Sequence, residues 1–246
     1  AAYTFPNESE IDKKKYLKNN IIKNLNFLEN CKIAKIKKII FFSTSNIYQF
    51  DKKKITAINE YGKINPQNYY GSTKLSIENL INNKKIFPNP VILRIFNIAG
   101  FNKNFKFKEY KNKYRRIMPS ISSAIKTKKN INIFGTFKNN NFQYSIRDYL
   151  HIDDFVDLII KVLKQKDLKG IFNIGSNKSY SLKEIITIFE KKINKKIKYK
   201  IKKLRKGELS YTLCDNRKLS RKLGWTPKKN IEDIVNSTIE WNKTKL

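Results

Sequence analysis

Residues 39–45 read Ile39-Ile40-Phe41-Phe42-Ser43-Thr44-Ser45, and this stretch decides the fold. Four consecutive apolar residues predict a strand that is buried on both faces, as the strands of parallel sheets are. A second apolar run, Val91–Phe96, predicts another strand of this kind. Between them the sequence predicts a helix over 70–83, after the loop residues Pro66 and Asn68. The order strand, helix, strand indicates an α/β fold with a parallel sheet.

The hydroxyls that end the first strand precede a tyrosine and a lysine with helical spacing. Tyr70 and Lys74 are four residues apart, which places them on one face of a helix. A free phenol has a pKa near about 10, and a nearby ammonium lowers it. Thr44 could share a proton with the reacting hydroxyl, so the three residues have what proton removal from a sugar alcohol needs. The alternative is a solvated helix face, but the position beside a strand end favours an active site.

The remaining elements follow from apolar spacing and from capping residues. Ser181 and Glu184 have the spacing of a capping box, and Asp153 and Asp154 are expected to cap a helix because acids favour a helix N-terminus. Residues 102–116 show no period and are expected to form a loop over the substrate. The predicted further helices span 12–30, 117–126, 153–164, 216–223 and 231–241, and the further strands span 131–134 and 171–174.

The composition excludes several classes of protein. The 246 residues contain no run of about 18 apolar residues, so we expect no membrane span. Two cysteines are too few for a disulfide framework, and they have no zinc-site spacing. The single histidine, His151, excludes a His-rich metal site, and we expect no metal. This cysteine usage fits a cytoplasmic location.

The formal charge of +33 has two interpretations. One is nucleic-acid binding. The other is compositional drift, because only seven of the 53 basic residues are arginine and the lysines are spread over every segment. No repeat of basic and aromatic residues of the kind seen on RNA-binding sheets occurs. We therefore expect no specific nucleic-acid partner, although the positive field attracts phosphate-bearing substrates.

Several segments in register resemble the extended short-chain dehydrogenases/reductases, in particular the NAD-dependent epimerase/dehydratase family and its 4-epimerases. The matching segments are Phe42–Tyr48, Tyr70–Lys74, Leu93–Asn97, Ile133–Gly135, Arg147–Ile152, Phe172–Gly175 and Leu223–Trp225. The resemblance covers nearly the whole chain. It implies a Rossmann-like doubly wound parallel sheet with a smaller α/β substrate domain, NAD as cofactor, and 4-epimerisation of a UDP-sugar of the UDP-glucose and UDP-galactose type.

The family's glycine-rich turn, Gly-x-x-Gly-x-x-Gly, which places the cofactor pyrophosphate at a helix N-terminus, does not occur in this sequence. We therefore expect the N-terminal βα units of the nucleotide-binding domain to be missing. The resemblance assigns residues 1–97 to the rest of that domain, with 147–175 returning to it. It assigns 98–146 and 176–246 to the nucleotide-sugar-binding domain.

The resemblance also assigns roles to individual residues. Tyr70 is the base that acts on the sugar 4-hydroxyl, Lys74 holds the nicotinamide ribose, and Thr44 hydrogen-bonds the reacting oxygen. The resemblance places His151 outside the site. Further cofactor contacts are assigned to Ser43, Phe96 and Asn20. Of the substrate contacts, Asn97, Arg147 and Arg205 are assigned to the diphosphate, Asn132 and Phe134 to the uracil, and Glu208 to the ribose.

Ser45 and Asn46 distinguish between branches of the family. Dehydratases carry Asp-Glu after the catalytic threonine, and decarboxylases carry Glu at the second position, whereas this chain has Ser45-Asn46. Elimination and decarboxylation then lack their proton shuttle, which favours epimerisation. There are two alternatives to a 4-epimerase. One is another nucleotide-sugar dehydratase, decarboxylase or reductase of the same family, and the other is a non-enzymatic relative that binds nucleic acid. The resemblance further implies a homodimer that pairs through the helix of Tyr70 and the helix before it.

Overall fold

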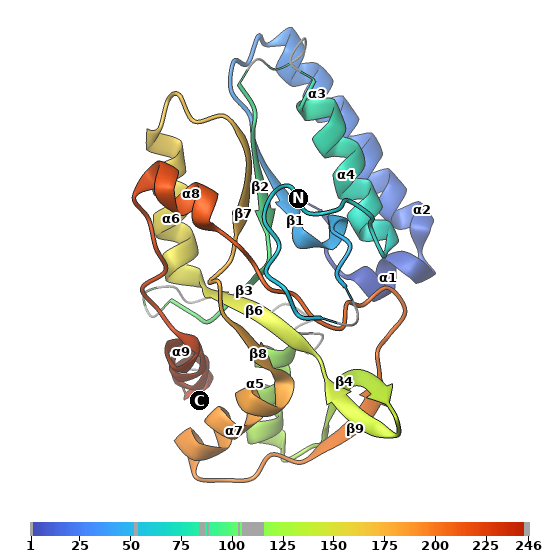
Figure 1. Cartoon of the computed structure of the whole chain (residues 1–246), viewed down its shortest axis with the longest axis vertical. Coiled ribbons are helices and arrows are strands. Elements are labelled where there is room, and N and C mark those ends of the chain that lie inside the picture. The colour runs from blue at the N-terminus through green and yellow to red at the C-terminus, as the bar shows by residue number, and fades with distance from the viewer. Residues whose placement is uncertain are drawn as a thin grey trace.

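The computed structural model describes residues 2–51, 54–83, 87, 89–102, 104 and 116–243. Its upper part in Figure 1 is built on a parallel sheet of β1 (Ile40–Thr44), β2 (Val91–Ile95) and β7 (Gly170–Ile174), in the order β1-β2-β7. Ile40 pairs with Val91, and Val91 pairs with Gly170, so the three strands end at the same edge. The predicted strand–helix–strand unit and its parallel sheet are confirmed.

Helices cover both faces of this sheet. Successive side chains of a strand point to opposite faces, and here both faces carry apolar side chains, so each face packs against helices. Ile92 of β2 packs with Ile77 and Ile81 on one face, and its neighbours Val91 and Leu93 pack on the other. The first face carries α1 (Pro6–Ile11), α2 (Lys13–Tyr16), a π-helical segment (Leu17–Ile22), α3 (Lys23–Ile33) and α4 (Tyr69–Ile81). The second face carries α6 (Ile152–Lys164) and α8 (Arg217–Leu223).

Two further sheets and three helices form the lower part in Figure 1. One sheet has the order β3-β6-β8, with β3 (Asn97–Ala99), β6 (Ile146–His151) and β8 (Ser179–Ser181). The other has the order β5-β4-β9, with β4 (Ile131–Lys138), β5 (Asn141–Tyr144) and β9 (Tyr199–Lys203). The helices α5 (Ile117–Thr127), α7 (Leu182–Ile193) and α9 (Ile231–Lys243) enclose a core centred on Ile121, Ile133, Ile185, Phe189 and Ile234.

The structure corrects three expectations. The first strand is not fully buried, since Phe42 is 42% exposed. Among the described residues β1 is the outer strand of its sheet, which explains this exposure. His151 caps α6: its Nδ1 accepts from Asp153 N at 3.1 Å, while Asp153 and Asp154 lie inside the first turn. Strand β4 continues beyond Phe134 because it forms a hairpin with β5.

The predicted helix over 12–30 is divided into α2, the π-helical segment and α3, and the elements α1, β3, β5, β8 and β9 were not predicted. Apart from β4, the remaining predicted elements lie within two residues of their observed bounds, and the capping box of Ser181 and Glu184 is present. The expected loop over 102–116 falls largely outside the described residues. Within the described part of the chain, no helix has the length and apolar character that a membrane crossing requires. The same residues contain no cluster of three His, Cys, Asp or Glu that could hold a metal ion.

Candidate active site

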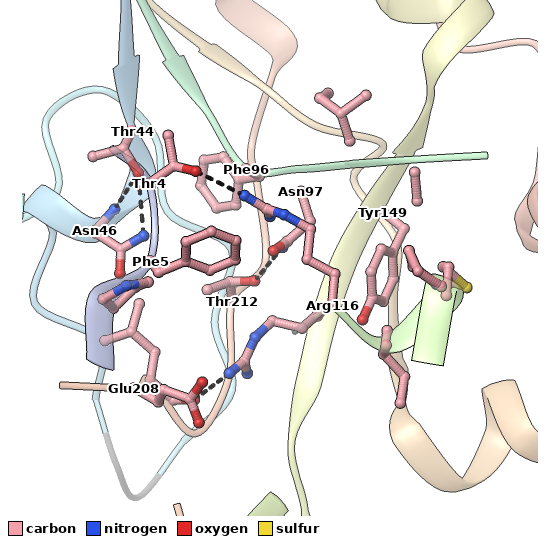
Figure 2. Close-up of a pocket in the computed structure, with 18 of the residues that line it drawn as sticks. Thr4, Phe5, Thr44, Asn46, Phe96, Asn97, Arg116, Tyr149, Glu208 and Thr212 are labelled. Atoms are coloured by element: carbon pink, nitrogen blue, oxygen red, sulfur yellow. Dashed lines mark hydrogen bonds between the residues drawn. The ribbon is translucent and has the colours of Figure 1, made fainter. Parts of the chain in front are cut away.

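A cavity of about 1340 Å³ lies between the two parts of the molecule. Its upper wall is formed by residues 2–7 and by the ends of β1 and β2, and its lower wall by α5, β4 and the segment 205–212. This is the carboxyl edge of the parallel sheet, where ligands of open α/β sheets bind. Figure 2 shows side chains from both walls directed into it.

The start of α4 is locked against the loop that follows β1. Asn68 caps the helix by accepting from Gly71 N at 2.8 Å, and its amide donates to Asn46 Oδ1 at 2.9 Å. Gly71 sits so close to this loop that a Cβ would lie 2.4 Å from the carbonyl oxygen of Asn46. Helix and strand end are thus held together, and this brings Tyr70 to Thr44.

The phenol of Tyr70 lies on the cavity wall and is hydrogen-bonded to Thr44. Burial raises the pKa of Tyr70, while the hydrogen bond from Thr44 and the charge of Arg116 oppose that rise. The oxygen of Thr44 accepts from Asn46 N at 3.2 Å and from Asn46 Nδ2 at 3.1 Å, which leaves its own proton for the phenol. The sequence reasoning paired Tyr70 with a strand-end hydroxyl, and the structure brings these two groups together.

Lys74 behaves differently from expectation. Its ammonium lies over the ring of Phe41, 4.3 Å from the centroid, and the side chain is buried. Desolvation lowers the pKa of Lys74 to about 8, against the opposing charge of Glu78. The ammonium that we expected to lower the pKa of Tyr70 is therefore turned to an aromatic ring, and in this structure the cation that acts on the phenol is Arg116.

A buried network that sequence reasoning missed anchors α4 to the sheet. Glu78, one turn after Lys74, accepts from Arg94 Nη2 at 2.7 Å and from Arg94 Nε at 3.1 Å. Arg94 also donates to Tyr48 Oη at 2.9 Å, and Tyr48 donates to Asn173 at 2.7 Å. The available signal was Arg94 itself, a charge inside an apolar strand that requires a partner.

Six residues were expected at the cofactor, and all except Asn20 line the cavity. The five that line it are Ser43, Thr44, Tyr70, Lys74 and Phe96. The hydroxyl of Ser43 is buried and makes no hydrogen bond among the described residues, so it is a polar group that a ligand could satisfy. With the ammonium of Lys74, this donor set fits the ribose and amide of a nicotinamide nucleotide. The expectation for Asn20 was wrong, because this residue does not line the cavity. Its side-chain amide is hydrogen-bonded to the backbone of Tyr3 and to Thr73, and it thereby links the N-terminal segment to α4.

The residues expected at the nucleotide and diphosphate meet at the other end of the cavity. Arg205 forms an ion pair with Glu208, and its guanidinium carbon lies 4.5 Å from the ring centroid of Phe134. Its Nε is buried and has no hydrogen-bond partner within the described part of the chain. Arg147 donates to three backbone carbonyls, those of Ile146, Leu209 and Ser210, which leaves two of its five N–H groups. Asn132 lines the same wall.

Asn97 lines the cavity but is not arranged as expected. Its Nδ2 donates to Asp148 O at 2.9 Å and to Thr212 Oγ1 at 3.3 Å (Figure 2). Both amide hydrogens are therefore used inside the protein, and the remaining Oδ1 is an acceptor. An acceptor suits a sugar hydroxyl, whereas a phosphate oxygen would repel it.

Comparisons with known proteins agree with this geometry. Residues 1–175 match the model of the NAD dependent epimerase/dehydratase family. The chain is 29% identical over 251 residues to the UDP-glucose 4-epimerase of Lactobacillus helveticus, covering 99% of this chain and 76% of that protein.

Two solved structures extend the similarity to three dimensions. The UDP-glucose 4-epimerase of Bifidobacterium longum in complex with NAD+ and UDP superimposes with a TM-score of 0.91 at 26% identity, covering 99% of this chain and 75% of that one. The UDP-glucuronic acid 4-epimerase of Bacillus cereus in complex with UDP-glucuronic acid and NAD gives a TM-score of 0.86 at 28% identity, covering 100% and 74%.

Proposed function

The chain belongs to the NAD-dependent epimerase/dehydratase family, and from this premise we propose that it is an NAD-dependent UDP-sugar 4-epimerase of the UDP-glucose and UDP-galactose type. The observation that carries the proposal is the hydrogen-bonded pair of Tyr70 and Thr44 on the wall of a large cavity whose other end holds arginines and an aromatic ring. The pair supplies a base for a sugar hydroxyl, and the other end suits a nucleoside diphosphate.

The residues of the site divide the reaction between them. Tyr70 removes the proton of the sugar 4-hydroxyl and later returns it, and Thr44 holds the same oxygen through its hydroxyl. NAD, when bound, supplies the acceptor and donor of the C4 hydride. Lys74 holds the nicotinamide ribose, with Ser43 and Phe96 on the same wall.

Asn46 favours epimerisation over elimination or decarboxylation. Its amide donates to Thr44 Oγ1 and accepts from Asn68, and an amide has no proton to shuttle at neutral pH. Among the described residues that line the cavity, Glu208 is the only carboxylate, and it is paired with Arg205. A dehydratase or decarboxylase would need a carboxyl group beside Thr44, where this chain has Ser45 and Asn46.

The sugar nucleotide is oriented by the second half of the site. We assign the diphosphate to Arg205 and Arg147, because guanidinium N–H groups fit phosphate oxygens. Arg205 Nε has no hydrogen-bond partner among the described residues, and Arg147 keeps two N–H groups beyond its three bonds to backbone carbonyls. Phe134 and Asn132 face the base, and Glu208 faces the ribose. In this proposal residues 98–146 and 176–246 form the nucleotide-sugar-binding domain, and 1–97 with 147–175 form the cofactor domain.

The proposal includes a homodimer and a cytoplasmic location. The helices α3 and α4, through which the dimer would pair, expose large apolar side chains to solvent. These are Leu25 (40% exposed), Phe27 (59%) and Leu80 (38%). Apolar side chains of this size on two adjacent helices are suited to an interface between copies.

The test is turnover by the purified protein supplied with NAD. We expect interconversion of UDP-galactose and UDP-glucose. We expect Tyr70→Phe to lose about 100- to 10,000-fold in kcat, the typical worth of general-base catalysis, while the affinity for UDP is unchanged. Equal turnover by Tyr70→Phe would refute the assigned base. Release of free NADH or of a deoxy sugar would instead indicate a reductase or a dehydratase.

A further inference from the structure

The charges that line the cavity are unbalanced. Among the described residues of its wall, five are cationic and one is a carboxylate. The cations are Lys74, Arg116, Lys129, Arg147 and Arg205, and the carboxylate is Glu208. A nucleoside diphosphate linked to a neutral hexose carries its negative charge only at the diphosphate, for which Arg147 and Arg205 are already assigned at one end of the cavity. Arg116 is not needed for that charge.

Arg116 occupies a different place in the cavity from the other two arginines. It directly precedes α5 on the lower wall and reaches across to the upper wall, where its Nη2 donates to Thr4 Oγ1 at 3.0 Å (Figure 2). Its guanidinium carbon lies 5.3 Å from the ring centroid of Phe5. The hydrogen bond and the aromatic ring together fix the plane and the direction of the guanidinium.

The charge of Arg116 is felt at the reacting end. It opposes the rise that burial causes in the pKa of Tyr70, and it also opposes the rise in the pKa of Tyr149, where the charge of Arg147 has the larger effect. Arg116 is therefore the arginine whose charge acts on the phenol of Tyr70, whereas Arg205 is paired with Glu208 at the nucleotide end.

The remaining hydrogen-bonding capacity of Arg116 is large. A guanidinium has five N–H donors, and among the described residues the guanidinium of Arg116 forms one hydrogen bond, to the neutral hydroxyl of Thr4. In the described part of the chain no carboxylate pairs with it. The side chain of Arg116 is exposed, so water solvates its charge in the free protein. A carboxylate accepts two parallel N–H bonds from a guanidinium, which a neutral sugar hydroxyl cannot do.

Resting on the proposed function, we propose that Arg116 binds a carboxylate on the sugar, so that the preferred substrates are UDP-hexuronic acids, with the carboxylate at C6, rather than neutral UDP-hexoses. C6 is attached to the carbon next to C4, so a C6 carboxylate lies beside the hydroxyl that Tyr70 deprotonates. Thr4 is a positioning residue, because it contacts the guanidinium and directs it toward the cavity.

The experiment compares two substrates that differ only at C6. Values of kcat/KM are measured for UDP-glucuronic acid and UDP-glucose, and the dissociation constants of both and of UDP are measured by calorimetry, with and without NAD. We expect the wild-type protein to prefer the uronic acid about 10- to 100-fold, the ratio that a hydrogen bond to a charged group provides. Arg116→Gln should abolish the preference and leave the affinity for UDP unchanged.

Two further variants sharpen the result. Thr4→Val keeps the guanidinium but removes its hydrogen bond, and it should reduce the same preference about 3- to 10-fold. Lys126→Gln removes one positive charge from the last turn of the same helix, outside the cavity lining, and it should retain the wild-type preference. It is the matched control for the overall charge.

The outcomes separate this inference from the proposed function. Equal losses for both sugars and for UDP in Arg116→Gln would place Arg116 on the diphosphate and overturn the inference. Epimerisation of UDP-glucose without any preference for the uronic acid would overturn it as well, with the proposed function intact. If neither sugar nucleotide were bound or epimerised, the proposed function would fail and the inference with it.

Discussion

Replacing Lys74 by Met is expected to stabilise the protein while it inactivates the site. The ammonium of Lys74 is buried, and desolvation lowers its pKa from 10.5 to about 8. The difference of about 2.5 between these pKa values corresponds to about 3 kcal/mol, since each pKa unit is worth about 1.4 kcal/mol. Met has a similar length and no charge to desolvate. Lys74→Met should therefore be more stable than the wild type by about 3 kcal/mol at pH 7.

The pH dependence distinguishes this reasoning from a general packing effect. Because the folded-state pKa of Lys74 is lowered, the unfolded chain binds more protons between pH 8 and pH 10.5, and wild-type stability rises with pH across this window. Below pH 8 Lys74 is protonated in both the folded and the unfolded state, and burial of its ammonium then destabilises the wild-type protein by the full amount. The stability advantage of Lys74→Met should thus shrink by about 3 kcal/mol between pH 8 and pH 10.5.

Urea unfolding of both proteins at several pH values measures this difference, and groups that titrate in both proteins cancel from it. Lys126→Met, which removes an exposed lysine from α5, is the matched control for the loss of one positive charge. A constant difference between wild type and Lys74→Met from pH 7 to pH 10.5 would refute the assignment of a buried, destabilising ammonium. The variant should at the same time lose turnover, because the proposed ribose contact is gone.

Three other predictions concern the support of the site and its nucleotide end. Arg94→Ala should lower the free energy of unfolding by about 3–5 kcal/mol, because it leaves the carboxylate of Glu78 buried without its partner; a loss below about 1 kcal/mol in urea unfolding would show that the pair is not buried in solution. Gly71→Ala should cost about 1–3 kcal/mol of stability and reduce kcat/KM, because the added Cβ would meet the carbonyl oxygen of Asn46 at 2.4 Å; a variant stabilised by its higher helix propensity would contradict this contact. Arg205→Gln should weaken UDP binding about 10-fold or more in calorimetry, since a charge-assisted donor to phosphate is lost; unchanged affinity would move the diphosphate away from Arg205.

The two carboxylates of the site region illustrate how context decides a role. Glu208 was expected from the sequence to contact the substrate, and the structure places it in the cavity but pairs it with Arg205. Glu78 was not expected at all, yet it joins the helix of Tyr70 to β2 through Arg94. Both residues are single acids in helical or loop sequence, and nothing in their local sequence separates the two environments.

The sequence by itself determined the strands around Phe42 and Leu93, the helix that carries Tyr70 and Lys74 on one face, and the loop of Pro66 and Asn68 before that helix. These features depend on apolar periodicity and on hydrogen bonds between residues a few positions apart, which are local and leave a readable pattern. The resemblance carried by the same segments also pointed to the family.

Only the tertiary structure decided the arrangement of the side chains. Thr44 meets Tyr70 because a glycine lets α4 approach the loop after β1, Lys74 turns to Phe41, Asn20 is consumed by Tyr3 and Thr73, and Arg116 crosses the cavity to Thr4. Each of these contacts joins segments far apart in the chain. Their geometry is set by close packing between elements, which no local pattern encodes.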